Sequence, residues 1–554
     1  MVRHKRHEAN QKAKMKAILF TTLALLLLVF SAAAQDTWSL VVCHSNDVHG
    51  GIDSSKAEFM NPEQPPDLGG GASAARLIHQ LRAYAQKKGD GFLLMDTGDI
   101  FQGTLVGTKT EGDAVVRYMN LVGYDLWVLG NHEFDLGRDV PEKLMEQADF
   151  AVMSANVYDT SGGVWKHFAR PYIIKDFGPV KVGIIGITTA GTVRAAFEEN
   201  IRNLYFAPET TALAAYRDTL RAMGVDVIIA ACHLGLPFDR YEAWDDLEKR
   251  EQEGWKSDYV RNAFELARRV PGIDILFAGD IHVGYQEPWV DPVTHTPCFQ
   301  GYGRGTNLLA VEFEFDRETK ELLRWKPFAE DGTLVTLFAD RFPRERDIAL
   351  AIDTSVARVE AGFNEKIGEA TAPILRSGEG ETPMGNLISD AMLWKLRGDI
   401  AITNKGGVRT DIGAGIITPH DVFNVLPFDN TLGAVTVTGK FFKDLLEDKV
   451  AYGGSGLYVA GVKVRIDKSK PRGERVVSLE IGGKPYQPDS TYRLVTTDYL
   501  LEGNSGMEKL SDLRNQAAVE SGTYMRDAVI EYIKDHSPIE PKLDGRWLTV
   551  GGNQ

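Results

Sequence analysis

The most informative part of this chain is Leu129-Gly130-Asn131-His132-Glu133-Phe134-Asp135, which follows directly on a short apolar run. An apolar run of this length bounded by glycine is typical of a buried strand. Asn, His and Asp are side chains that bind metals or move protons, and here they stand where the strand ends. Ligand sites in α/β sheets gather at such strand ends, on loops held by a rigid scaffold. The stretch therefore predicts a strand that leads into a functional loop.

The same pattern recurs through the first three fifths of the chain. Apolar runs that predict buried strands occupy residues 40–43, 92–95, 126–129, 182–185, 227–230 and 273–277. Helical periodicity lies between several of them, for example at Ala75, Ile78, Leu81 and Ala85. We therefore expect a layered α/β domain over residues 36–341. An amphipathic helix is predicted over residues 347–367, inside a linker at 342–367.

A second α/β region is expected over residues 368–550. It has strand-like runs at 400–402 and 435–437 and a helical stretch at 387–396. The whole chain has 554 residues, of which 43% are hydrophobic and 25% charged. This composition is that of a globular protein with more than one domain, and it excludes a disordered tail, a coiled coil and a collagen-like fibre. The net charge of −15 argues against a nucleic-acid polymer as partner.

The predicted strands of the first region end in polar clusters. Together these clusters supply Asp47, His49, Asp99, Asn131, His132, Asp135, His233, Asp280 and His282. Carboxylates, imidazoles and an amide suit Zn²⁺, Mn²⁺ or Fe. In an extended Asp-x-His, Asp47 and His49 share one strand face, so both can bind one ion. A carboxylate such as Asp99 can bridge two ions, as in the two-metal sites that act at phosphorus.

Any one of these clusters is a weak signal, because Asp-x-His is more often a turn cap and Gly-Asp is a frequent turn. Five of them in order, each at a strand exit, predict a metal centre. The three cysteines, Cys43, Cys232 and Cys298, are an odd number and give no disulfide framework. We expect them to be buried free thiols.

The first residues have the layout of a secretory signal peptide. Residues 1–16 are basic with one acid, residues 17–30 are apolar, and Ser31-Ala32-Ala33-Ala34-Gln35 follows. We expect cleavage after Ala34, with Met15 as an alternative start, so that residues 1–34 are removed. The alternative is an uncleaved anchor, although the run is shorter than the ~20 residues of a membrane span. The expected protein is periplasmic or secreted, has no stable membrane anchor and is a monomer.

Residues 40–50 (LVVCHSNDVHG) and residues 124–135 resemble the two signature segments of the 5′-nucleotidase family, within the metallophosphoesterase superfamily. The resemblance implies an N-terminal four-layered α/β/β/α metallophosphoesterase domain. A helix would join it to a C-terminal α/β 5′-nucleotidase substrate-binding domain. The resemblance also implies two divalent metal ions: Asp47, His49 and His282 would bind one, Asn131 and His233 the other, and Asp99 both. His132 paired with Asp135 resembles the catalytic dyad.

One position departs from the family's pattern. At the last cluster the family usually has Gly-His-x followed by His, Gln or Asn. This chain has Gly279-Asp280-Ile281-His282 instead. By position, Asp280 replaces a His ligand of the second metal. Asp is a harder, anionic ligand, so it would shift the preference from Zn²⁺ toward Mn²⁺ or Fe. Alternatively, Asp280 points away and one of the two sites is weak.

The second region carries candidate substrate-binding residues. The resemblance nominates Asn404, Gly407, Arg409, Phe428, Asn430, Tyr499, Ser505 and Arg376. Glycines expose backbone N–H groups to an anion, and an Arg adds a planar bidentate donor. Phe428 and Tyr499 correspond to two aromatics that sandwich a nucleobase. The alternative for Phe428 is a role in the hydrophobic core. The alternative for Arg376 is an exposed side chain, because the distance in sequence from Arg376 to the motif that follows it is two residues longer than in the family. Ser505 replaces an Asp that holds the ribose in the family.

The leading hypothesis is an exported dimetal phosphohydrolase of nucleotide catabolism. It would dephosphorylate 5′-nucleotides, and secondarily UDP-sugars, by attack of a metal-bound hydroxide at phosphorus. The close alternatives are a 2′,3′-cyclic-nucleotide 2′-phosphodiesterase/3′-nucleotidase and a broad phosphomonoesterase. From a different class, a non-catalytic nucleotide-binding receptor would be expected to lack a bridging or catalytic group. Asp99, His132 and Asp135 are all present, which favours an enzyme.

Overall fold

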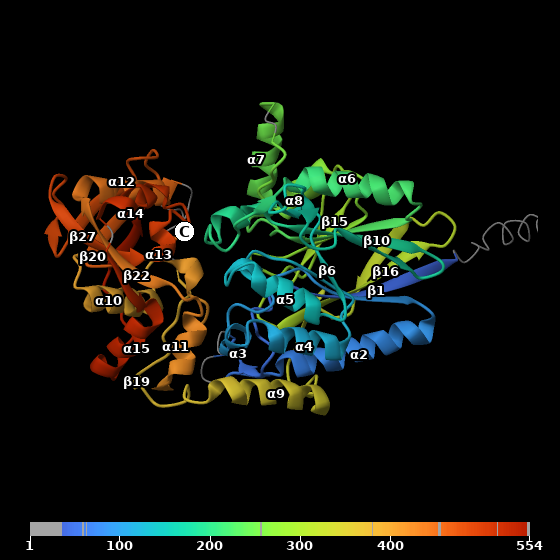
Figure 1. Ribbon diagram of the computed structural model, residues 1–554, viewed down its shortest axis with the longest axis horizontal. Coiled ribbons are helices and arrows are strands. Elements are labelled where there is room, and N and C mark those ends of the chain that lie inside the picture. Colours follow the sequence, from blue (N-terminus) through green and yellow to red (C-terminus); the bar gives the residue numbers. More distant parts are fainter. Residues whose placement is uncertain are drawn as a thin grey trace, which may run out of the picture.

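The computed structural model describes residues 36–57, 60–61, 64–254, 257–378, 380–451, 456–517 and 519–550. Two α/β halves lie side by side, and α9 (Arg346–Glu360) runs along one edge of the first half toward the second (Figure 1). The predicted signal segment, residues 1–34, lies outside the described residues. Within the described ranges, every helix is too short or too polar to cross a bilayer.

The first half contains two large sheets. One has the strand order β17-β16-β1-β4-β5-β6, with β18 paired to β16, and the other has the order β14-β15-β13-β12-β10-β9. The first sheet is built from β1 (Thr37–Ser45), β4 (Gly91–Asp96), β5 (Leu126–Val128), β6 (Ala151–Met153), β16 (Asn307–Asp316), β17 (Leu322–Pro327) and β18 (Leu334–Thr336). The second is built from β9 (Tyr172–Asp176), β10 (Lys181–Thr188), β12 (Val227–His233), β13 (Ile275–Ala278), β14 (Trp289–Val290) and β15 (Pro297–Gln300). The six strands predicted for this half are all confirmed.

The two sheets pack face to face and helices cover their outer faces. Leu40, Val42, Ile184, Ile229 and Phe277 are among the buried side chains between the sheets. The outer helices are α2 (Gly70–Lys88), α3 (Leu105–Lys109), α4 (Asp113–Val122) and α5 (Asp139–Gln147) on one side, and α6 (Glu209–Ala222), α7 (Arg240–Gln252) and α8 (Ala263–Arg269) on the other. The result is the expected order of helices, sheet, sheet and helices. Strands covered on both faces read as continuous apolar runs, which explains the sequence pattern.

Short elements complete the first half. They are β2 (Ser55–Lys56) with β3 (Asp67–Leu68), the small sheet β11-β7-β8 (Leu204–Phe206, Val157–Asp159 and Lys166–His167), and the 3₁₀ turns η1 (His132–Phe134) and η2 (Ala190–Arg194). Cys43, Cys232 and Cys298 are free and buried, as predicted. Burial raises the pKa of the Cys43 thiol to about 12, so this thiol is unreactive at neutral pH.

The predicted helix over residues 347–367 is wrong at its end. Helix α9 spans Arg346–Glu360, and Gly362 has φ +90°, a conformation in which a right-handed helix cannot continue. Ile348 and Ile352 are buried against the first half, where α9 packs on α2, α3 and α4. The helix is therefore part of the first half's packing, and the chain crosses to the second half after it. The division into residues 36–341, 342–367 and 368–550 stays a prediction.

The second half is built around a five-stranded sheet of order β23-β20-β27-β22-β28 and a four-stranded sheet of order β26-β25-β24-β29. Their strands are β20 (Ile400–Asn404), β22 (Thr431–Thr438), β23 (Leu457–Ala460), β24 (Val462–Asp467), β25 (Val476–Ile481), β26 (Lys484–Pro485), β27 (Thr491–Thr497), β28 (Val519–Tyr524) and β29 (Trp547–Val550). A small pair joins β19 (Gly368–Ala370) to β21 (Gly415–Ile417). The strands predicted at 400–402 and 435–437 are confirmed.

Helices cover both faces of the five-stranded sheet. They are α10 (Pro383–Leu396), α11 (Pro419–Val425) and α15 (Met525–His536) on one face, and α12 (Gly439–Ala451), α13 (Asp498–Leu501) and α14 (Glu508–Ala517) on the other, with the turn η3 (Lys405–Gly407) after β20. The helix predicted at 387–396 is confirmed within α10. Its start is set by Thr382, whose side chain accepts the backbone N–H of Gly385, and by Pro383 at the first position.

Candidate active site

The polar clusters predicted from the sequence meet between the ends of the two sheets of the first half. Strands β1, β4 and β5 run parallel in one sheet, and β10, β12 and β13 run parallel in the other. Parallel strands bring their carboxyl ends to the same edge, so loops far apart in sequence become neighbours. The loops after β1, β4, β5 and β13, together with the last residue of β12, carry the candidate ligands.

Five of these ligands have a left-handed backbone. Their φ angles are 51° at Asp47, 50° at His49, 59° at Asp99, 75° at Asp280 and 55° at His282. Positive φ is uncommon for non-glycine residues, although Asp and His tolerate it better than most, and such strained residues cluster at functional sites. The extended conformation expected for Asp47 and His49 is therefore wrong: β1 ends at Ser45, and both residues lie in the turn that follows it.

Two glycines let the loops approach closely. A Cβ on Gly98 would lie 2.6 Å from Nδ1 of His233, and a Cβ on Gly130 would lie 2.3 Å from Oδ1 of Asp99. A Cβ atom does not approach other atoms this closely, so a larger residue at either position would push the ligands apart. The glycines that precede Asp99 and Asn131 therefore serve the spacing of the site.

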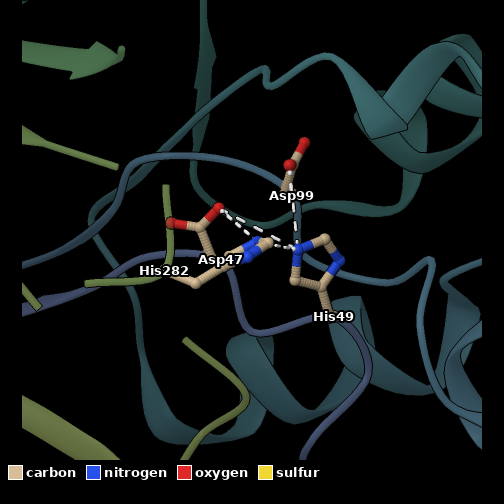
Figure 2. A group of neighbouring side chains, drawn as sticks. All are labelled: Asp47, His49, Asp99 and His282. Carbon is tan, nitrogen blue, oxygen red and sulfur yellow. Dashed lines mark hydrogen bonds and ion pairs between the residues drawn. The ribbon is translucent and has the colours of Figure 1, made fainter. Parts of the chain in front are cut away.

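The first cluster of candidate ligands consists of Asp47, His49, Asp99 and His282 (Figure 2). One ligand atom of each lies within 4.8 Å of the others. Nε2 of His282 is 3.3 Å from Oδ1 of Asp47, and Nε2 of His49 is 3.8 Å from Oδ2 of Asp99. His49 donates its Nδ1–H to the carbonyl of Gln102 at 2.5 Å, which leaves Nε2 available to a cation.

A second cluster shares Asp99 with the first. Nε2 of His233 lies 3.1 Å from Oδ2 of Asp99 and 3.0 Å from Oδ1 of Asn131. Oδ1 of Asp280 is 3.7 Å from the same nitrogen, so the Asp280 carboxylate faces this cluster. His233 donates its Nδ1–H to the carbonyl of Thr97 at 2.7 Å. His49 and His233 are thus held in the same way, by a bond from Nδ1 to a backbone carbonyl, which fixes the ring and leaves Nε2 for a cation.

The charges of these groups fit a divalent cation. Asp47 and Asp99 are buried and lie close to Asp280. Burial raises the pKa of Asp280 to about 6, whereas the charges of His233 and His132 outweigh burial and hold the pKa of Asp99 well below its usual value. Gathered carboxylates without a cation are costly. Oxygen and imidazole donors of this kind bind divalent metal ions.

The predicted dyad lies beside these clusters. Nδ1 of His132 is 2.6 Å from Oδ2 of Asp135, and the backbone N–H of His132 donates to Oδ1 of Asp99 at 2.9 Å. Burial disfavours a charged imidazole, but the carboxylates of Asp135 and Asp99 outweigh it and raise the pKa of His132 to about 9. The protonated form of the ring is therefore favoured, and of the two ring nitrogens of His132 only Nδ1 has a hydrogen-bond partner among the described residues.

Glu133 supports the site in a way that sequence analysis missed. Its buried carboxylate accepts the backbone N–H groups of Gly130 at 2.5 Å and of Asp99 and Ile100 at 2.9 Å each. These bonds tie the loop after β4 to the loop after β5. The sequence signal that could have revealed Glu133 was its position: it is a charged residue between the candidate ligands and the apolar Phe134.

The second half reaches the first cluster directly. Nη2 of Arg409 is 2.7 Å from Nε2 of His49 and 3.2 Å from Nε2 of His282. The ring of Phe428 stacks on His132 with centroids 5.3 Å apart and planes inclined by 28°. The Arg409 guanidinium lies 5.5 Å from the centre of the same Phe428 ring. The loops after β20 and α11 therefore close over the dyad.

A cavity of about 230 Å³ lies between the two halves. Of the residues predicted to bind substrate, seven line it: Asn404, Gly407, Arg409, Phe428, Asn430, Tyr499 and Ser505. Asn131, His132 and Asp135 line it from the first half. The sequence did not point to four further lining residues of the first half, Gln102, Leu136, Ala195 and Phe197.

Several buried polar atoms of residues that line this cavity have no hydrogen-bond partner within the described part of the protein. Among the described residues, Oε1 of Gln102, Oδ1 of Asn404 and Nε of Arg409 are buried without a hydrogen bond. Buried polar groups are normally paired, so these three atoms are available to a ligand or to water in the cavity. Arg376 is outside the lining: it is exposed, and its Nη1 donates to the carbonyl of Val408 at 3.1 Å. Burial lowers the pKa of Arg409, and the positive charge of Arg376 lowers it further.

Facing sheets between helices, with carboxylates and imidazoles at the strand ends, define a metallophosphoesterase. The family described as calcineurin-like phosphoesterase matches residues 40–284, and the family described as 5′-nucleotidase, C-terminal domain, matches residues 366–512. The chain therefore contains a calcineurin-like phosphoesterase domain followed by a 5′-nucleotidase C-terminal domain, and it is a metal-dependent phosphoester hydrolase.

Relatives match along nearly the whole chain. The 5′-nucleotidase of Bos taurus is 29% identical over 95% of this chain and 93% of its own length. Protein UshA of Yersinia enterocolitica is 27% identical over 91% of this chain and 92% of its own. The crystal structure of a 5′-nucleotidase precursor from Thermus thermophilus superposes with a TM-score of 0.80 at 28% identity, covering 93% of this chain and all of that one.

Proposed function

We propose that this protein removes phosphate from nucleotides, 5′-nucleotides first, in the cavity between its two halves. One observation carries the proposal. The same cavity is lined by the His132–Asp135 dyad, by Asn131 of the metal clusters and by the arginine and aromatic rings of the second half. The relatives that bear the name 5′-nucleotidase support the same substrate class.

We propose two divalent ions, Zn²⁺, Mn²⁺ or Fe. Asp47, His49 and His282 would hold the first, Asn131, His233 and Asp280 the second, and Asp99 both. The support is the shared position of Asp99 between the two clusters. When bound, such a pair supplies Lewis acidity toward the phosphoryl oxygens and lowers the pKa of coordinated water.

The protein's own groups act around the phosphoryl group. Arg409 can donate to its oxygens from the second half, because Nε is unpaired and Nη2 already reaches the first cluster. His132 can donate the proton on Nε2 either to the phosphoryl oxygens or to the leaving oxygen of the ester, since Asp135 holds Nδ1. Asn404 and Gly407 offer an amide and a backbone N–H at the same wall.

The nucleoside would occupy the part of the cavity bounded by Phe428 and Tyr499. Both rings line the cavity, and within the described residues they make no ring contact with each other, which leaves the space between them to a base. Ser505 and Asn430 lie at the same wall and can hydrogen-bond the sugar. Oγ of Ser505 is 3.5 Å from the hydroxyl of Tyr499. Arg376 stays a prediction: its guanidinium would contact the phosphate of a bound nucleotide.

A substrate panel tests the proposal. Purified protein loaded with Mn²⁺ or Zn²⁺ is given AMP, UDP-glucose, 2′,3′-cyclic AMP, 3′-AMP and p-nitrophenyl phosphate. We expect the highest kcat/KM for AMP. A clear preference for the cyclic nucleotide or for 3′-AMP would replace the proposed activity with that of a cyclic phosphodiesterase/3′-nucleotidase. Equal kcat/KM for AMP and p-nitrophenyl phosphate would indicate a broad phosphomonoesterase.

Phe428→Ala is expected to weaken nucleotide hydrolysis selectively. Stacking of a base on an aromatic ring contributes ~1–3 kcal/mol, so kcat/KM for AMP should fall about 5-fold or more relative to that for p-nitrophenyl phosphate. The chromogenic substrate should also lose some activity, because Phe428 stacks on His132. The ratio of the two kcat/KM values is the measurement. An unchanged ratio would show that Phe428 supports the fold or His132 rather than the base.

Asp280→His is expected to keep metal at both clusters and to change the preferred metal. Oδ1 of Asp280 already faces His233, and imidazole is a softer ligand than carboxylate, so Zn²⁺ should support activity better in the variant than in the wild type. Activity is compared after reconstitution with Zn²⁺ and with Mn²⁺. An identical Zn²⁺:Mn²⁺ activity ratio in both proteins would argue that Asp280 binds no metal.

We propose further that the protein is exported and works as a monomer in the periplasm or outside the cell. The support for export is the basic, apolar and small-residue order of residues 1–34; the monomeric state stays a prediction. N-terminal sequencing of the protein recovered from the export compartment, with the cut expected after Ala34, tests this assignment.

A further inference from the structure

The metal-bearing half contributes an aromatic ring to the same cavity. Phe197 follows η2, lines the cavity and meets Tyr499 of the second half, with ring centroids 6.3 Å apart. The ring contacts described above place Phe428 on His132 and Phe197 on Tyr499. Each proposed base-stacking ring thus touches a ring of the first half. The inference drawn from this contact rests on the proposed function, because it concerns the base of the nucleotide.

The segment that carries Phe197 is fixed to the dyad. The carbonyl of Phe197 accepts the backbone N–H of Asn200 at 3.0 Å, and Nδ2 of Asn200 donates to the carbonyl of Asp135 at 2.7 Å. On the other side, Ala196 is buried and its N–H donates to the carbonyl of Thr192 at 2.9 Å. The ring is therefore held at a set place relative to the catalytic groups.

The orientation of the ring limits what it can do. The planes of Phe197 and Tyr499 are inclined by 88°. A base stacked parallel to Tyr499 therefore cannot also stack parallel to Phe197, and it would meet that ring at right angles. Edge-to-face contacts of aromatic rings are favourable. A contact of this kind involves one edge of the base and depends on how far the base extends.

We propose that Phe197 is a specificity-determining residue that contacts one edge of the base. Tyr499 and Phe197 come from different halves, so recognition of the base requires both halves together. The edge contact makes the site sensitive to the size and shape of the base, whereas stacking alone accepts any base.

The test compares Phe197→Ala and Phe197→Leu with the wild type, using AMP, UMP and ribose 5-phosphate, which has no base. An edge-to-face aromatic contact corresponds to about a 2- to 12-fold effect. The kcat/KM ratio of nucleotide to ribose 5-phosphate should fall by that amount in Phe197→Ala and less in Phe197→Leu. The AMP:UMP ratio should also shift, by at most the same factor, because the two bases present edges of different size to the ring.

Val193→Ala is the matched control, since Val193 lies in the same segment and is 52% exposed; it should leave both ratios unchanged. Melting temperatures check the folding of all variants, and Phe197→Leu keeps the test open if Phe197→Ala unfolds. Equal losses on AMP and UMP would show that Phe197 only supports Tyr499, and equal losses on ribose 5-phosphate would exclude base contact. Either result would overturn the inference about Phe197 but would leave the proposed function intact. A wild type without preference for AMP over ribose 5-phosphate would overturn the proposed function as well.

Discussion

Asp99→Asn should abolish phosphatase activity and release metal from both clusters. Asp99 is the carboxylate that the two clusters share, lying 3.8 Å from Nε2 of His49 and 3.1 Å from Nε2 of His233. Asn keeps the shape of the side chain but removes the negative charge that two cations would share. Loss of a group that only supports a ligand costs ~10–100-fold in metal affinity or activity, so losing the shared ligand should cost more.

Bound metal per chain, measured by mass spectrometry after dialysis, gives the readout. Asp96→Asn is a suitable control, because Asp96 is buried three residues earlier and binds Ser45 and the backbone of Gly98 instead. Burial raises the pKa of Asp96 well above its usual value, so a neutral amide is a close substitute there. Full metal occupancy in Asp99→Asn would contradict the bridging role.

His132→Ala should leave the metal content unchanged while kcat falls. Groups that transfer a proton in the transition state contribute about 10²- to 10⁴-fold, and we expect a loss in that range on both AMP and p-nitrophenyl phosphate. The expectation rests on geometry: Nδ1 of His132 lies 2.6 Å from Oδ2 of Asp135, and His132 lines the cavity between the two halves.

The two readouts of His132→Ala separate two roles. Loss of metal in the variant would mean that His132 is itself a ligand. A kcat close to that of the wild type would remove it from the catalytic groups, and the stacking of Phe428 on its ring would then be its main role.

Much of the fold and of the metal centre could be predicted because local signals coincide there. Apolar runs such as that at 126–129 mark strands buried on both faces, and parallel strands bring their ends together. Asp47, Asp99 and His233 were therefore predicted as neighbours without knowledge of the packing. The end of α9 was misjudged, since helical periodicity continues past Glu360 while Gly362 adopts a positive φ.

The remaining site residues depend on tertiary contacts that leave no periodic signal. The carbonyl of Gln102 orients His49, and any residue type offers a carbonyl. Phe197 lies in an irregular segment, and its place at the cavity depends on the approach of the second half. Arg376, which a resembling motif nominated, has an exposed side chain that donates to the carbonyl of Val408, and its role toward substrate stays a prediction.

The most direct test of the account is a metal titration of the metal-depleted protein, with bound metal and AMP hydrolysis measured on the same samples. Activity should be absent without metal, and it should reach its maximum as occupancy approaches two ions per chain. Full activity at one ion per chain, or AMP hydrolysis by the metal-free protein, would contradict a two-metal site shared by Asp99.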